Sequence, residues 1–143
     1  MKTVKQVLQE KGRLIWSISP EATVFSALEM MAEKNVGALL VMVGDELIGI
    51  VTERDYARKV ILHGKFSKDV KVEEIMTSKV ICASPDYTVE DCMALMTEKH
   101  FRHLPVLEDG KLVGIISIGD VVKSIIIEQG YLINHLVNYI TGR

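Results

Sequence analysis

Two short segments of the sequence pair a hydroxyl side chain with a carboxylate three residues later. They are Thr52 with Asp55, and Ser117 with Asp120. Each pair ends a Gly-x-x-(Thr/Ser)-x-x-Asp pattern that follows an apolar run, where a strand is expected to end and a helix to begin. A hydroxyl and a carboxylate at such a point can cap the free N–H groups of the first helical turn, or can contact a polar ligand held there. Taken singly, each pair favours capping.

The other nucleophilic and metal-binding side chains form no recognised constellation. The four histidines (His63, His100, His103 and His135) include no pair at i, i+4, and Cys82 and Cys92 fall on an expected strand and an expected helix. These spacings favour core or surface roles over a zinc site or thiol catalysis. No glycine-rich loop leads into a helix in the manner of a nucleotide-hydrolase P-loop. We therefore predict a binding protein without a catalytic cofactor, and not an enzyme.

The amino-acid composition further narrows the class of protein. The chain has 143 residues, 48% hydrophobic and 25% charged, with a net charge of −2, which is typical of a folded globular protein. Because the chain has no excess of positive charge, nucleic acid is not an expected partner. No apolar run approaches the roughly 20 residues of a membrane-spanning helix, and no secretory signal opens the chain. With only two cysteines, we expect a cytoplasmic protein that does not engage membranes.

The chain contains one sequence repeated twice. Residues 17–60 align with 82–125 at a constant offset of 65, without a gap and with thirteen identities, among them Pro20/Pro85 and Asp55/Asp120. This register predicts an N-terminal helix with a first repeat at 1–64, a linker at 65–72, a second repeat at 73–130, and a helical tail at 131–143.

Each copy carries signals for the same elements in the same order. Thr23 and Thr88 are expected N-caps, each followed by apolar residues at i, i+3, i+4 and i+7, the spacing of a buried helical face. Two hairpins follow, at 38–42 with 47–51 and at 103–107 with 112–116, and second helices begin near Glu53 and Ile118. Leading strands are expected at 13–16 and 79–82. The fold class is α/β (α+β), built of two β-α-β-β-α repeats.

Three further segments lie outside this plan. Residues 2–9 are expected to form a short helix closed by Gly12, and residues 72–76 a helical turn. Residues 121–139 are strongly apolar and predict a helix, which Gly130 is expected to divide. Such a tail is too hydrophobic to stay exposed, so we expect it to cover the core or a partner subunit.

The duplicated Gly-x-x-(Thr/Ser)-x-x-Asp segment in tandem resembles the cystathionine-β-synthase (CBS) domain pair, or Bateman module. Further matches are Ile75–Thr77 at the opening of the second copy and Phe101–Val106 at its hairpin. The resemblance covers nearly the whole chain. It implies two repeats packed about a pseudo-twofold axis, a ligand in the cleft between them, and a homodimer. Duplication together with this motif moves the balance from capping toward ligand contact.

Members of the family bind adenosine-containing ligands, and the resemblance implies which residues would contact them. Asp55 and Asp120 would accept hydrogen bonds from ribose hydroxyls, while Thr52 and Ser117 would lie beside a phosphate. The first composite site would comprise Thr52, Arg54, Asp55, Ile81, Cys82, His103 and Pro105. The second would comprise Ser117, Asp120, Gly12, Ile15, Ser17, Val36 and Gly37, with Arg102 as a borrowed cation. Thr77, from the opening motif of the second copy, is a further candidate.

The two sites are not expected to be equivalent, because the copies differ in their cations. Arg54 corresponds to Gly119, and Arg102-His103 corresponds to Gly37-Ala38. The Asp55 site therefore ranks first as a nucleotide site. AMP or NAD(H) is favoured, with ATP, ADP and S-adenosylmethionine as further candidates. The predicted function is a regulatory adenine-nucleotide sensor that signals energy or redox state to an unidentified regulated protein. The alternative is a protein-interaction module with vestigial clefts; an enzyme acting on nucleotides is a much weaker third.

Overall fold

The computed structural model describes residues 2–141, except for the side chains of residues 131, 132, 139 and 141. The chain is a mixed α+β protein that forms two compact units. We call them the central unit, which comprises Leu14–Ile81 with Asp109–Leu112, and the terminal unit, which comprises the chain up to Arg13, Cys82–Glu108 and the chain from Val113 onward. Each unit holds most of one repeat.

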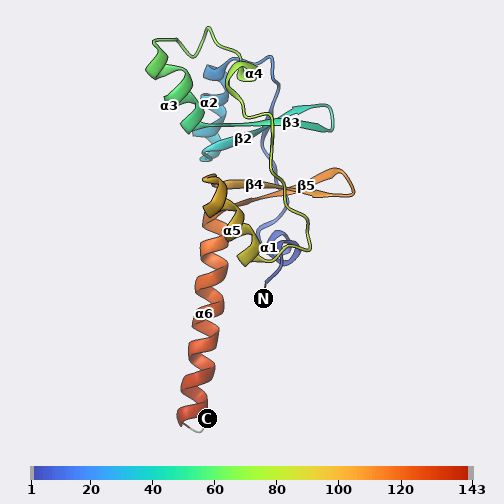
Figure 1. Cartoon of the computed structure of the whole chain (residues 1–143), viewed down its shortest axis with the longest axis vertical. Coiled ribbons are helices and arrows are strands. Elements are labelled where there is room, and N and C mark those ends of the chain that lie inside the picture. The colour runs from blue at the N-terminus through green and yellow to red at the C-terminus, as the bar shows by residue number, and fades with distance from the viewer. Residues whose placement is uncertain (1, 142–143) are drawn as a thin grey trace. The chain divides into compact units, whose positions relative to one another are not determined.

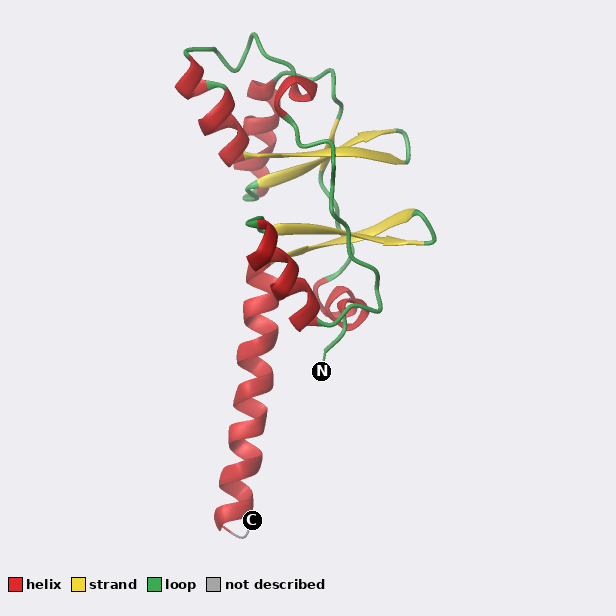
Figure 2. Ribbon diagram, in the orientation of Figure 1, coloured by secondary structure: helices red, strands yellow, loops and turns green. Residues whose placement is uncertain are grey.

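The central unit is built on a three-stranded sheet (Figures 1 and 2). The strand β1 pairs in parallel with β2, and β2 pairs antiparallel with β3, with an irregularity in register between Val41 and Met42. Its elements are β1 (Ser17–Ile18), α2 (Val24–Lys34), β2 (Ala38–Val43), β3 (Glu46–Thr52), α3 (Glu53–Lys59), a 3₁₀ turn η1 (Ile61–His63) and α4 (Val72–Ile75).

The terminal unit repeats this plan with a two-stranded sheet. Its elements are α1 (Val4–Lys11), α5 (Val89–Lys99), β4 (His103–Glu108), β5 (Lys111–Ser117) and α6 (Ile118–Thr141). In place of a leading strand, Ala83 forms a single parallel bridge to Val106. No helix within the described residues is long and apolar enough to cross a membrane.

Equivalent residues form the two cores, as the repeat predicts. The hydroxyls of Thr23 and Thr88 accept hydrogen bonds from the third backbone N–H of their helices, which confirms both as N-caps. Apolar residues on one face of each helix then lie against the hairpin. The central core includes Val24, Ala27, Met31, Leu39, Val41 and Val51. The terminal core includes the equivalent positions Val89, Cys92, Met96, Leu104, Val106 and Ile116.

The helices that precede the two repeats are exchanged between the units. α1 precedes the first repeat, yet Val4, Val7 and Leu8 belong to the core of the second, and the N–H of Val4 donates to the carbonyl of Tyr87 at 2.8 Å. α4 precedes the second repeat, yet its Val72 belongs to the core of the first. The prediction that grouped the N-terminal helix with the first repeat therefore differs from the observed compact units.

A glycine on each hairpin makes room for the exchanged segment. A Cβ at Gly114 would lie 2.6 Å from Cδ2 of Leu8, and a Cβ at Gly49 would lie 2.7 Å from Sδ of Met76 and 3.0 Å from the carbonyl oxygen of Thr77. The N–H of Ile50 donates to that same carbonyl at 3.0 Å, and the N–H of Thr77 donates back to Ile50 at 2.9 Å. The shared glycine of the repeat motif therefore has a packing role in both units.

Two expectations for secondary structure were wrong. The leading strands are not at 13–16 and 79–82, because the parallel pairing partners are Ser17 and Ile18 in the first copy and a single bridging residue, Ala83, in the second. Gly130 does not divide the last helix, since α6 runs unbroken from Ile118 to Thr141 across the predicted boundary at 130/131. One glycine costs a helix only about 1 kcal/mol relative to alanine, which a long apolar helix tolerates. The expected coverage of the tail is not seen in this chain, and residues 142–143 lie outside the described residues.

Candidate functional site

In the central unit, Thr52 and Asp55 cap the start of α3 by hydrogen-bonding to each other. The N–H and the hydroxyl of Thr52 donate to Oδ2 of Asp55 at 3.0 and 3.2 Å, and the N–H of Asp55 donates to Oγ1 of Thr52 at 3.1 Å. The other carboxylate oxygen, Oδ1, lies 3.1 Å from Nζ of Lys59, one turn along the helix. Asp55 is only 9% exposed. Both of its oxygens therefore have partners within the chain.

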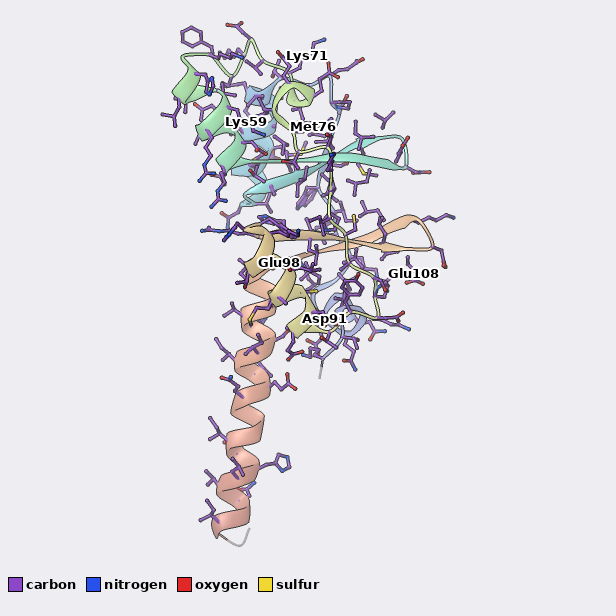
Figure 3. All side chains as sticks on the ribbon, in the orientation of Figure 1. Lys59, Lys71, Met76, Asp91, Glu98 and Glu108 are labelled. Atoms are coloured by element: carbon purple, nitrogen blue, oxygen red, sulfur yellow. The ribbon has the colours of Figure 1, made fainter. Side chains whose placement is uncertain are left out.

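Lys59 also holds the end of the exchanged segment. Its Nζ donates to the carbonyl of Ile75, at the end of α4, at 2.8 Å, and Figure 3 shows Lys59 on α3 in the same unit as Met76. One cation thus links the carboxylate at the start of α3 to the segment that passes beside Gly49. The sequence signal for this contact is the i, i+4 spacing of Lys59 from Asp55.

In the terminal unit, Ser117 and Asp120 repeat this geometry at the start of α6. The N–H and the hydroxyl of Ser117 donate to Oδ2 of Asp120 at 2.8 and 3.0 Å, and the N–H of Asp120 donates to Oγ of Ser117 at 3.2 Å. Here the cation comes from α1. Nζ of Lys11 lies 2.6 Å from the same Oδ2 and donates to the carbonyl of Ile115 at 3.0 Å. The Asp120 side chain is 21% exposed, against 12% for Asp55.

Further basic residues lie beside this second pair. The N–H of Ile118 donates to the carbonyl of Arg102 at 2.8 Å, which holds Arg102 and His103 next to the start of α6. Burial and the positive charges of Lys11 and Arg102 lower the pKa of His103, partly opposed by Asp120. Burial raises the pKa of Asp120, but hydrogen bonds from Lys11 and Ser117 and the charge of Lys11 outweigh it, so that this pKa lies below its ordinary value. At neutral pH the site therefore contains an ionised carboxylate, two cations and a neutral imidazole.

Replacing Lys11 by methionine tests this electrostatic arrangement. Without the ammonium group, the pKa of Asp120 and the pKa of His103 are both expected to rise, since Lys11 lowers both. Because folding lowers both pKa values, each group contributes stability that is lost as the pH falls. For His103 this loss begins as the pH falls below 6.5, the ordinary pKa of histidine. For Asp120 it occurs at lower pH, where the carboxylate becomes protonated. NMR titration of the two side chains in Lys11→Met measures the shifts.

Lys5→Met is the matched control, because Lys5 is an exposed lysine on the same helix. It should leave both pKa values where they are in the parent protein. If Lys11→Met moved neither value, the ion pair between Lys11 and Asp120 would not exist in solution.

At the equivalent place of the central unit, Gly37 and Ala38 stand where the terminal unit has Arg102 and His103. The N–H of Glu53 donates to the carbonyl of Gly37 at 3.1 Å, as Ile118 does to Arg102. An open hollow of about 420 Å³ lies here, lined by Val36, Gly37 and Glu53 together with residues of α2 and the turn that follows it. Glu53 thus brings a negative charge to the start of α3, where the equivalent position of the terminal unit is Ile118.

The predicted site residues are divided between the units. Thr52, Arg54, Asp55 and Ile81 lie in the central unit, whereas Cys82, His103 and Pro105 of the same predicted site lie in the terminal unit. Likewise Ser117, Asp120, Gly12 and Arg102 lie in the terminal unit, and Ile15, Ser17, Val36, Gly37 and Thr77 in the central one. The composite assignment therefore stays a prediction. Within one unit, the structure brings together Ser117, Asp120, Arg102 and His103. It adds Lys11, for which no local sequence signal exists.

Neither cysteine has an activated thiol. Burial raises the pKa of Cys82, and burial together with the charge of Asp91 raises the pKa of Cys92 to about 11. Neither cysteine forms a disulfide, and both thiols remain protonated at neutral pH. Among the described residues, no group of three or more His, Cys, Asp or Glu side chains is placed to hold a metal ion.

Two units that share the order α-β-β-α, with matching capped helix starts, define a tandem-repeat protein, and comparison with known proteins identifies the repeat. The sequence model of the CBS domain matches residues 7–62 and 72–127. The chain therefore belongs to the CBS-domain family and carries two CBS domains in tandem.

Three relatives show the range of this similarity. The mitochondrial CBS domain-containing protein CBSX3 of Arabidopsis thaliana is 40% identical over 150 residues, which cover 98% of this chain and 72% of that protein. A CBS-domain protein of Burkholderia ambifaria MC40-6 superposes with a TM-score of 0.86 at 54% identity, over 90% of this chain and 96% of that one. The CBS domain pair of protein MJ0100 was solved with 5′-methylthioadenosine and S-adenosyl-L-methionine. It superposes with a TM-score of 0.77 at 25% identity, over 87% of this chain and 96% of that one.

Proposed function

We propose that this protein is a non-catalytic regulatory module that binds an adenosine-containing ligand. The observation that carries the proposal is the duplicated hydroxyl–carboxylate pair, fixed with nearly the same hydrogen bonds at the start of α3 and of α6. An ionised carboxylate held in this way can accept hydrogen bonds from the two hydroxyls of a ribose. Support comes from the MJ0100 domain pair, whose two ligands both contain adenosine.

The charges of the terminal unit favour a ligand that carries phosphate. Lys11, Arg102 and the start of α6 present positive charge beside Asp120. Such a cluster complements a monophosphate or diphosphate, as in AMP or NAD(H), better than the uncharged thioether of methylthioadenosine. Our sequence-based ranking placed the Asp55 site first because it assigned Arg54 and His103 there. Lys11 supplies the missing cation to the Asp120 pair, and we now propose that both pairs contact ligand.

Ligand-dependent stabilisation tests the proposal. Chemical denaturation of the full chain is followed in AMP, ADP, ATP, NAD⁺, NADH, S-adenosylmethionine and methylthioadenosine, with guanosine monophosphate as the base control. A ligand at about 100 times its dissociation constant is expected to add about 2.7 kcal/mol to the free energy of unfolding. AMP or NAD(H) should act at lower concentration than methylthioadenosine. If none of the adenosine compounds stabilised the protein at millimolar concentration, the proposal would be wrong.

The alternative function, an interaction module with vestigial clefts, is supported by one observation. Asp55 already has a partner on each oxygen, and both carboxylates satisfy the N-terminus of a helix without any ligand. On this hypothesis the pairs are purely structural. For either function we propose a reducing compartment, the cytosol, because neither cysteine forms a disulfide, although the Arabidopsis relative is mitochondrial.

A further inference from the structure

The last helix has two apolar faces, and only one of them is covered. Val121 and Ser124 are buried in the terminal unit, where α6 packs beside α5. On a different face of the helix, large apolar side chains are exposed from Val122 to Ile140. The C-terminal part of α6 extends away from the other helices and strands of the terminal unit (Figure 3). The exposed fractions are 45% for Val122, 62% for Ile126, 59% for Ile133, 54% for Leu136 and 80% for Ile140.

These exposed residues recur with a period of seven. Ile126, Ile133 and Ile140 are each seven residues apart, and Val122, Gln129 and Leu136 form a second series with the same spacing, four residues before the first. Alternating steps of four and three are the a and d positions of a heptad repeat. A helix that lies on a globular surface has no need of a strict seven-residue period, whereas two helices that coil around each other require it. We call these six residues the heptad stripe.

The surface around the stripe is suited to the close approach of another helix. α6 has 24 residues, and its charged side chains are Asp120, Lys123 and Glu128, none of which lies at an a or d position. At its base, an open hollow of about 500 Å³ is lined mainly by apolar atoms, from Ile118, Gly119, Val122, Lys123, Ile126 and Ile127. Gly119 occupies the a position one heptad before Ile126, where the absence of a side chain leaves the backbone accessible.

We propose that the heptad stripe is the dimerisation surface of the protein, and that its occupant is the α6 helix of a second copy, in a parallel two-stranded coiled coil. The a positions 126, 133 and 140 are all isoleucine and Leu136 occupies a d position, a combination that favours two strands. Gln129 decides the orientation. In a parallel pair it faces the same glutamine of the second copy, and the two amides can hydrogen-bond, whereas an antiparallel pair in the matching register sets each glutamine against an isoleucine. A single polar layer of this kind fixes register and direction.

The mass of the full chain in solution tests the surface. The parent protein, 16.0 kDa per chain, is expected to sediment as a dimer at micromolar concentration. Ile133→Asp places a charge in the centre of the stripe and should weaken dimerisation at least a hundredfold. Asn134→Asp introduces the same charge at the neighbouring exposed position and should leave the dimer intact. A monomeric parent, or a dimer equally insensitive to both substitutions, would overturn the proposal. Circular dichroism verifies that both variants fold.

Disulfide trapping tests the orientation. In a parallel pair, a cysteine at the d position 136 faces its own copy at a distance that a disulfide spans. Leu136→Cys should therefore form covalent dimers under mild oxidation, while Asn134→Cys and the parent, with its native Cys82 and Cys92, should form few. A mixture of Ile126→Cys and Leu136→Cys distinguishes the antiparallel arrangement. If the mixed disulfide formed in preference to the Leu136→Cys homodimer, the parallel geometry would be wrong. Absence of trapping in both would reject the coiled coil.

Discussion

Substitution of Leu39 or Leu104 by alanine is expected to lower the free energy of unfolding by about 2–5 kcal/mol, the range observed when a buried leucine is truncated. Both side chains are fully buried, at equivalent positions of β2 and β4, each within the core of its unit. The loss combines the transfer free energy of the three removed carbon atoms, Cγ and the two δ methyl groups, with the cost of the cavity left behind. It is a large share of the roughly 5–15 kcal/mol that stabilises an ordinary domain.

Urea denaturation measures this loss, and Leu62→Ala is the matched control. Leu62 lies in η1 with 78% of its surface exposed, so the same substitution there should change the unfolding free energy by less than about 0.5 kcal/mol. Equal losses at Leu62 and at the two core positions would contradict the packing described above. A loss at Leu39 but none at Leu104 would contradict the equivalence of the two cores.

The second large effect is expected on ligand affinity. Removing the carboxylate in Asp55→Ala or Asp120→Ala should weaken binding of the adenosine ligand at least about a hundredfold at the altered site, because two hydrogen bonds to a charged acceptor contribute about 1.5–3 kcal/mol each. Both substitutions also remove a helix cap, so stability falls in either case. Isothermal titration with the ligand that stabilises the parent protein measures affinity separately from stability.

Asp91→Ala provides the control that separates the two effects. Asp91 caps α5 with Thr88 through the same pair of hydrogen bonds, at 2.9 and 3.1 Å, but belongs to no predicted site. It should reduce stability and leave affinity unchanged. If Asp55→Ala and Asp120→Ala behaved like Asp91→Ala, with unchanged ligand affinity, the two pairs would be caps alone and the interaction-module alternative would be favoured.

Local sequence signals predicted most of the fold. The Thr23 and Thr88 caps, the apolar faces of α2 and α5, and both hairpins follow from residues within one turn or one strand of each other, where short-range periodicity is informative. Because the sequence is repeated, each of these signals occurs twice, at equivalent positions of the two copies. The weakest predictions were the leading strands, because two or three residues of parallel pairing, as at Ser17 and Ile18, carry almost no periodicity.

The candidate site was predicted in part for the same reason. The Thr52–Asp55 and Ser117–Asp120 pairs are local motifs, and the sequence identified both. Lys11 is 109 residues from Asp120, and nothing near it indicates an ion pair, since its contact depends on the exchange of α1 into the other repeat. The exposure of the heptad stripe on α6 could not be predicted from the sequence either. An apolar periodic sequence is the same whether the core of its own chain or a second chain covers it.

That exchange of α1 also sets an order of events during synthesis of the chain. The central unit is nearly continuous in sequence, so most of its core can form as soon as Ile81 has left the ribosome. The terminal unit joins the first residues to the last ones, and Val4, Val7 and Leu8 must wait for Leu104 and Ile116 before they are buried. Contacts between such distant residues form slowly. The apolar face of α1 therefore stays uncovered in the nascent chain until most of the terminal unit has been synthesised, which makes α1 the segment most in need of protection by a chaperone.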